Sequence, residues 1–182
     1  PANGVGDIPS FTATNTTNSP ITATLSVIAT ANGCSKPAEI FTITVNPSPV
    51  VTFSAAPQTI CSGSTSAITT LTSSTSGVTF SWTATQAAGI SGVLTSGTIT
   101  IPAQTLTNTT AVPITVTYIA EATTPGTSAC PEAVYSYTIT VNPKPSITEV
   151  FTTSICGGAA FTITPSSSAS NSIPAGTTYS WS

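Results

Sequence analysis

The chain has 182 residues, of which 39% are hydrophobic and only 4% charged, and its formal net charge at pH 7 is −3. Its only cationic side chains are Lys36 and Lys144, so it lacks the positive charge that binding to nucleic-acid phosphates requires. It also contains no His, which excludes Ser-His-Asp and Cys-His catalysis, and we expect neither an enzyme nor a cofactor.

We expect neither a membrane-spanning nor a secretory segment within this sequence. No apolar run approaches the roughly 18 residues that a transmembrane helix needs. The chain does not begin with Met, and it has no charged region followed by an apolar one at its start, as a signal peptide would have. We therefore expect this sequence to be an excerpt from a longer protein.

Apolar residues alternate with Thr or Ser in several short segments, which is the period of a β-strand with one buried face. Gly, Ser, Thr and Pro turns separate these segments, and no helical period occurs. The pattern predicts an all-β fold made of antiparallel β-sandwiches with about seven strands each. In chain order, the segments are residues 21–27, 41–45, 50–53, 78–82, 114–120 and 135–141.

Three blocks of sequence recur with a period of about 95 residues. Residues 8–17 match 101–110, residues 41–49 match 137–145, and residues 60–63 and 79–82 match 155–158 and 178–181. These repeats predict the C-terminal part of one unit at 1–46, a complete unit at 47–142 and the N-terminal part of another at 143–182.

The junctions between units read Asn-Pro-x-Pro and contain Pro47 and Pro49, and then Pro143 and Pro145. Proline fixes the backbone φ angle, so two prolines within three residues favour a short, extended and stiff linker. We therefore expect the sandwiches to follow one another end to end as a semi-rigid rod.

Trp82 and Trp181 occupy the same position of the repeat, each within an alternating apolar segment. That position predicts that both indoles lie in the core of their sandwiches. The alternative is an exposed aromatic platform that binds sugars.

Taken together, Ile-Cys-x-Gly, [Phe/Tyr]-Ser-Trp, Leu-Thr-Asn-Thr-Thr and Tyr-Thr-Ile-Thr-Val-Asn-Pro resemble a PKD-like (Ig-like) repeat. Such repeats occur in very large cell-surface adhesins of Bacteroidota, including gliding adhesins exported by the type IX pathway. The resemblance implies a secreted protein at the bacterial cell surface, in a filament attached to the outer membrane. It implies no catalytic or ligand-binding residues.

Four cysteines lie at two repeated positions, Cys61 and Cys156 in the Ile-Cys-x-Gly turn and Cys34 and Cys130 in the last hairpin loop. In an exported protein this arrangement suggests disulfides, and no CxxC pair or His supports a zinc site. Pairing of Cys61 with Cys130 inside the complete unit is the simplest connectivity, leaving Cys34 and Cys156 with partners outside the sequence. The alternative joins the first turn of one unit to the last hairpin of the next.

Other polar motifs are weaker candidates. Asn15-Thr16-Thr17 and Asn108-Thr109-Thr110 match the N-glycosylation sequon, but turn chemistry explains them as well. The acidic residues are scattered without the spacing of a calcium loop, so no metal site is expected. Glu121 and Glu132 flank one hairpin loop, and we assign them no chemistry.

These observations favour a structural stalk that holds an adhesive tip away from the cell and serves surface attachment or gliding motility. Its partners would be neighbouring repeats of the same chain, with other adhesin chains or surface glycans as further candidates. The alternative function is a repeat that itself binds glycans or partner adhesins. Because the chain is nearly uncharged, we also expect weak self-association.

Overall fold

The computed structural model describes residues 4–124, 134–168 and 171–182. Throughout these residues the regular structure consists of strands in several sheets with mostly antiparallel pairing, without a helix, which confirms the all-β fold class. The described residues form two compact units. One comprises residues 4–51, 73–79 and 122–124, and the other comprises 52–72, 80–121, 134–168 and 171–182.

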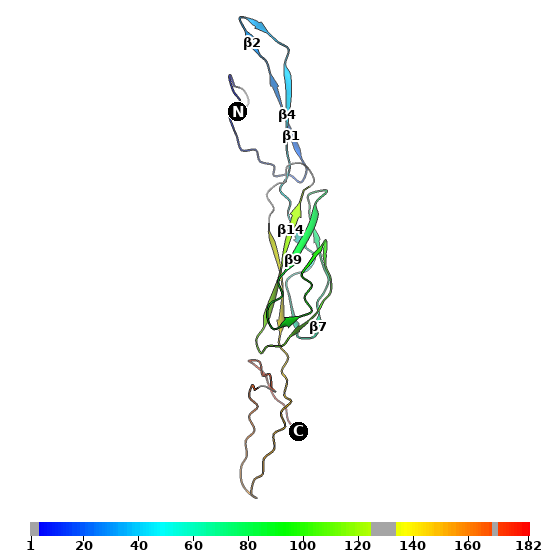
Figure 1. Cartoon of the computed structure of the whole chain (residues 1–182), viewed down its shortest axis with the longest axis vertical. Helices are drawn as coiled ribbons and strands as arrows, with labels where there is room; N and C mark the ends of the chain where they lie inside the picture. The colour runs from blue at the N-terminus through cyan, green and yellow to red at the C-terminus, as the bar shows by residue number, and fades with distance from the viewer. Residues whose placement is uncertain (1–3, 125–133, 169–170) are drawn as a thin grey trace. The chain divides into compact units, whose positions relative to one another are not determined.

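The first unit is built on one long hairpin, drawn in blue and cyan in Figure 1. Strands β1 (Ile21–Val27) and β4 (Glu39–Val45) are antiparallel and pair along their full length, from Ile21↔Val45 to Val27↔Glu39. The short strands β2 (Thr30–Ala31) and β3 (Cys34–Ser35) continue the hairpin to its tip. There Asn32 and Gly33 have positive φ angles of 52° and 79°, the conformation that tight hairpin turns require.

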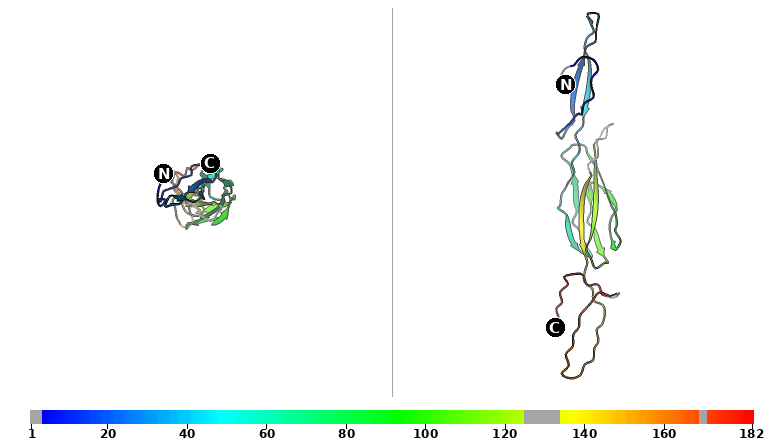
Figure 2. Two further views of the ribbon diagram at one scale, coloured as in Figure 1. Left: turned by 90° about the horizontal axis from the view of Figure 1, so that it is seen from above. Right: turned by 90° about the vertical axis from the view of Figure 1, so that its left-hand side faces the viewer.

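The second unit contains a five-stranded sheet with the strand order β11-β9-β14-β15-β6. Its centre is an antiparallel pair, β14 and β15, which lie side by side in Figure 2. The edge strand β6 joins β15 in parallel, with Ile139↔Gln58 and Asn142↔Cys61 as the first and last pairs. The strands are β6 (Gln58–Cys61), β9 (Thr79–Ala84), β11 (Ser96–Thr98), β14 (Ile114–Thr123) and β15 (Tyr135–Asn142).

Two three-stranded sheets, ordered β12-β8-β5 and β10-β13-β7, complete this unit. Side chains from their strands and loops meet the large sheet: the Phe53 and Tyr137 rings have centroids 5.2 Å apart. Their strands are β5 (Thr52–Phe53), β7 (Ser64–Thr65), β8 (Thr69–Thr72), β10 (Ile90–Ser91), β12 (Thr100–Ile101) and β13 (Thr105–Asn108).

The core of the second unit follows the period of two in the sequence. In β14 the side chains of Val116, Tyr118 and Ala120 are fully buried, whereas Thr115 and Thr117 between them face solvent. Burying each large apolar side chain contributes about 1.5–3 kcal/mol to stability. The core comprises Leu71, Trp82, Ile90, Ile101, Leu106, Val116, Tyr118, Ala120, Tyr137, Ile139 and Val141.

Residues 143–182 form no paired strands in their described part, only a single bridge between Ser146 and Ser172. The core position predicted for Trp181 is therefore not observed, since the indole is 96% exposed. This segment has no sheet, so no strands lie beside the ring as β11 and β14 lie beside Trp82 on β9.

The four linker prolines differ in their surroundings. Pro47 and Pro49 are buried, whereas Pro143 is half-buried and Pro145 is exposed. The repeated Asn-Pro-x-Pro sequence thus accompanies two different degrees of burial.

Candidate functional site

The strongest shared feature of the two hairpins is a hydrogen-bonded motif around an asparagine, which we call the asparagine clasp. In the complete repeat, residues 47–142, the asparagine clasp consists of Asn108, Thr110, Val112 and Val141. The Asn108 amide nitrogen donates to the carbonyl oxygens of Val112 and Val141, at 2.8 Å each. Its Oδ1 accepts from the Thr110 backbone N–H and lies 2.8 Å from the Thr110 hydroxyl. That hydroxyl in turn contacts the Val112 carbonyl and accepts from its N–H.

The same contacts recur in the first hairpin, with Asn15, Thr17, Ser19 and Val45 in the corresponding places. Asn15 donates to the carbonyl oxygens of Ser19 and Val45 at 2.8 Å each, and its Oδ1 accepts from the Thr17 N–H at 2.9 Å. The Thr17 hydroxyl repeats the three contacts of Thr110. The clasp therefore ties the segment that leads into each hairpin to the hairpin's last strand.

The clasp explains the repeated Asn-x-Thr sequence through turn chemistry. The side-chain amide nitrogen of Asn108 donates both of its hydrogens to carbonyl oxygens, and the residue is only 5% exposed. A glycan cannot be attached to a nitrogen held in this way while the fold is intact.

A serine on the neighbouring segment completes the clasp in the full unit. The Ser62 hydroxyl donates to the Asn108 carbonyl at 3.0 Å and accepts from the Asn108 N–H at 2.9 Å. The Ser62 N–H donates to the Asn142 carbonyl at 2.8 Å. These bonds join the turn after β6 to β13 and β15.

Trp82 lies in β9 with only 2% of its surface exposed. Its Nε1–H is shared between the carbonyl oxygens of Thr98 and Thr100, at 2.7 and 3.0 Å. Its ring meets Tyr118 edge-on, with a centroid distance of 5.6 Å and an interplanar angle of 68°. The ring has no face open to solvent, so it does not form a sugar platform in this fold.

The residue paired with Trp82 on β11 is Gly97. A Cβ atom at Gly97 would lie 2.7 Å from Cε2 and 2.9 Å from Nε1 of the indole, closer than side-chain atoms pack. Glycine is required here because the indole lies flat against the β11 backbone.

A buried polar network connects the two layers at Tyr118. Its hydroxyl donates to Gln104 Oε1 at 3.2 Å, and the same oxygen accepts from the Leu94 N–H at 2.7 Å. The Gln104 backbone is in turn paired with Ser66. Burial raises the pKa of the Tyr118 hydroxyl, and the neighbouring Tyr137 adds to this rise, while the Gln104 hydrogen bond acts in the opposite direction.

We expect the stability of this unit to fall above about pH 10, where an unfolded tyrosine loses its proton. A raised pKa means that the folded state holds its proton at a pH where the unfolded state releases it, so alkali favours unfolding. Urea denaturation between pH 8 and 11 measures this loss. Replacing Tyr118 by Phe should lower the free energy of unfolding by about 1 kcal/mol at pH 8. Between pH 8 and 11 the free energy of unfolding of this variant should then fall less steeply than that of the wild type. If the free energies of unfolding of the wild type and of Tyr118→Phe fell in parallel with rising pH, the loss in alkali would not come from Tyr118.

Cys34, Cys61 and Cys156 are free, exposed thiols, and no disulfide joins any of the described residues. The predicted partner of Cys61, Cys130, lies outside the described residues, as does Glu132. The pairing of Cys61 with Cys130 and the pairing between units both stay predictions.

The described residues bring no charged groups together for chemistry. Among them, no three Cys, Asp or Glu side chains lie close enough to hold a metal ion. Lys36 and Glu39 form an ion pair of 3.2 Å whose side chains are 69% and 63% exposed, so it contributes little. The described residues also include no helix with the length and hydropathy to cross a membrane.

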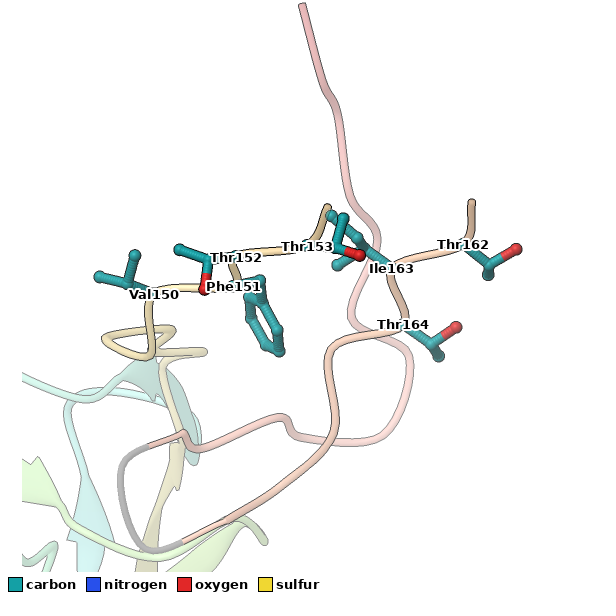
Figure 3. Close-up of a pocket in the computed structure, with 7 residues that line it drawn as sticks. All are labelled: Val150, Phe151, Thr152, Thr153, Thr162, Ile163 and Thr164. Carbon is teal, nitrogen blue, oxygen red and sulfur yellow. The ribbon is translucent and has the colours of Figure 1, made fainter. Parts of the chain in front are cut away.

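Two shallow grooves occur in the described residues, and one of them, at the tip of the first hairpin, is lined by Lys36 together with Ala29, Thr30, Ala31, Cys34 and Ser35. The other has a volume of about 330 Å³ and lies between two extended segments, Val150–Thr153 and Thr162–Thr164. Figure 3 shows Ile163 directed toward the first of these segments. All lining residues are Thr, Val, Phe or Ile, so the groove offers apolar contact and hydroxyl groups without acid-base chemistry.

Sequence reasoning identified Trp82 but missed Gln104, Gly97 and Ser62, whose roles depend on partners on other strands. The repeated Asn-x-Thr block was the signal for the clasp, although its contact with the distant Val141 could not be read from it.

Comparison with known proteins gives one family. Residues 58–145, from β6 to the second Asn-Pro-x-Pro junction, match the PKD-like domain family. No curated protein matches the chain. The matched residues contain the five-stranded sheet, the clasp at Asn108 and the buried Trp82. Residues 58–145 of this chain therefore constitute a PKD-like domain, as the resemblance of its repeat motifs predicted.

Proposed function

We propose that this chain is a structural spacer, part of the stalk of a large cell-surface adhesin that holds a binding tip away from the cell. PKD-like domains are typical of cell-surface proteins and are usually non-catalytic, which supports this role. The lack of His and the uncharged groove between Val150–Thr153 and Thr162–Thr164 agree with a mechanical role instead of a catalytic one.

The observation that carries the proposal is the repetition of framework between units. The pairs Ile21↔Val45 to Val27↔Glu39 correspond one by one to Ile114↔Val141 to Ala120↔Tyr135, and the clasp is reproduced contact by contact. The hairpin loops, in contrast, differ in length and sequence between residues 29–36 and 120–131. A spacer needs a constant framework of strands and junctions and leaves its loops free to differ, which agrees with this pattern.

The resemblance of the motifs extends the proposal to an adhesin of Bacteroidota that is exported by the type IX pathway and serves attachment or gliding. The protein would act outside the cell, with neighbouring repeats as its principal contacts. Cysteine pairing would then occur in an oxidising compartment.

Small-angle X-ray scattering of dilute full chain tests the spacer. A semi-rigid spacer should give the distance distribution of a rod, because Asn-Pro-x-Pro linkers extend by about 3.1 Å per residue and resist bending. Replacing the half-buried Pro143 and the exposed Pro145 by Gly should shorten the largest dimension while the urea midpoint of the PKD-like domain stays unchanged.

Two results would contradict the proposal that the chain is a spacer. One is a wild-type chain that scatters as a compact or freely jointed particle. The other is specific glycan binding by the full chain on a glycan array, which would favour repeats that bind ligands themselves.

A further inference from the structure

The chain enters and leaves the second unit close to two neighbouring strands that run in the same direction. It enters at Thr52 on β5, continues through residues 54–57 into the edge strand β6, and leaves at Asn142, the last residue of β15. β6 and β15 are parallel, with Ile139↔Gln58 as the first pair and Asn142↔Cys61 as the last. We call these two strands the parallel pair.

The entry point lies at the end of β15 that is opposite the exit. The rings of Phe53 and Tyr137 have centroids 5.2 Å apart, and Tyr137 lies five residues before Asn142, about 17 Å along the strand. Tension that separates Thr52 from Asn142 therefore slides β6 along β15. The evenly spaced bonds of a parallel ladder share such a shearing force, whereas bonds between strands that are peeled apart bear it one after another.

The Tyr137 hydroxyl on β15 fixes the beginning of β6. It accepts from Gln58 Nε2 at 2.6 Å and donates to the Ala56 carbonyl oxygen at 3.1 Å. At the other end, the Ser62 N–H donates to the Asn142 carbonyl oxygen at 2.8 Å. β6 is thus bonded to β15 at both ends, beyond the pairing between the two strands.

From this geometry we infer that the parallel pair, held in register by the Tyr137 hydroxyl, is the element that resists unfolding of the PKD-like domain under tension along the chain. The inference rests on the proposed spacer function, because a spacer transmits tension through both of its linkers. Residues 46–51 and 143–145, the two linkers, lie inside the sequence, so the loading of this domain is independent of what lies beyond either end.

The strand that precedes the parallel pair offers less resistance. β5 is joined to β8 by the pairs Thr52↔Thr72 and Phe53↔Leu71, followed by a bond from the Ser54 N–H to the Thr70 carbonyl oxygen. We expect β5 to detach first and the sliding of β6 along β15 to limit the rate of unfolding. Forced unfolding is governed by this rate, so bonds that remain intact when β6 slides do not affect it.

Unfolding of single molecules at constant force tests the inference on the full chain, tethered at both ends, with its four cysteines replaced by Ser. Release of residues 52–142 identifies the domain, because it adds about 300 Å of extended chain. Tyr137→Phe keeps the ring but removes the bonds to Gln58 and Ala56. At a given force this variant should unfold about tenfold faster than the wild type.

Tyr118→Phe is the matched control. It removes a buried hydroxyl that bonds to Gln104 and belongs to β14, outside the parallel pair. Both variants should lower the urea midpoint, but Tyr118→Phe should change the unfolding rate under force by less than about twofold. Equal unfolding rates of the two variants under force would overturn the inference.

A change in the direction of pulling provides an independent readout. Thr115 and Thr140 are paired across β14 and β15, so handles attached to Thr115→Cys and Thr140→Cys peel these strands apart instead of shearing the parallel pair. The force that unfolds the domain within one second should then fall to less than about half of its value for tethering at the chain ends. An unchanged force would also overturn the inference. Scattering tests the spacer separately, so either proposal can fail while the other holds.

Discussion

Replacing Trp82 by Ala should lower the free energy of unfolding of the PKD-like domain by about 3–5 kcal/mol, a large part of the stability of a small domain. The indole is 2% exposed, packs edge-on against Tyr118 and gives its only N–H to the carbonyl oxygens of Thr98 and Thr100. Truncation removes the packing and leaves these carbonyls without their donor. Urea denaturation followed by circular dichroism measures the loss.

The repeat supplies a matched control for this variant. Trp181 stands at the same repeat position but is 96% exposed, so Trp181→Ala in dilute solution should change the stability of the domain by less than about 0.5 kcal/mol. Gly97→Ala should resemble Trp82→Ala in direction, because the added methyl group displaces the indole from β11. A Trp82→Ala protein with wild-type stability would mean that the ring is exposed in solution and would reopen the sugar-platform hypothesis.

Replacing Asn108 by Ala should cost about 3 kcal/mol. The change leaves the carbonyl oxygens of Val112 and Val141 and the N–H of Thr110 without their partner, and each unsatisfied buried group costs about 1–3 kcal/mol. The loss is measured by the same urea titration. Because the clasp ties β13 to β15, we also expect faster hydrogen exchange at the end of β15.

Asn15→Ala is the matched control for the clasp. It removes the same set of bonds from the first hairpin, where the residue is only half-buried and water can replace the lost partners. Its effect on the PKD-like domain should be below about 0.5 kcal/mol. An Asn108→Ala variant that is no less stable than Asn15→Ala would show that the clasp contributes nothing to the domain.

The sequence by itself determined the parts of this protein that depend on local pattern. Alternation of apolar residues with Thr predicted β1, β4, β14 and β15, because a strand directs successive side chains to opposite faces. The repeated blocks predicted that the two hairpins are built alike, and the observed registers agree pair by pair. The position of Trp82 in such a segment is likewise the one at which the structure buries an indole.

Only the tertiary structure decided which of these matched positions are covered. Trp82 and Trp181 have closely similar local sequences, yet Trp82 is buried in the core of the second unit and Trp181 is exposed, because burial depends on strands that are distant in the chain. The parallel addition of β6 to β15, the fit of Gly97 against the indole and the closure of the clasp on Val141 have the same origin. Local periodicity specifies the face of a strand, whereas its partners follow from long-range packing, which a single sequence does not encode in any one segment.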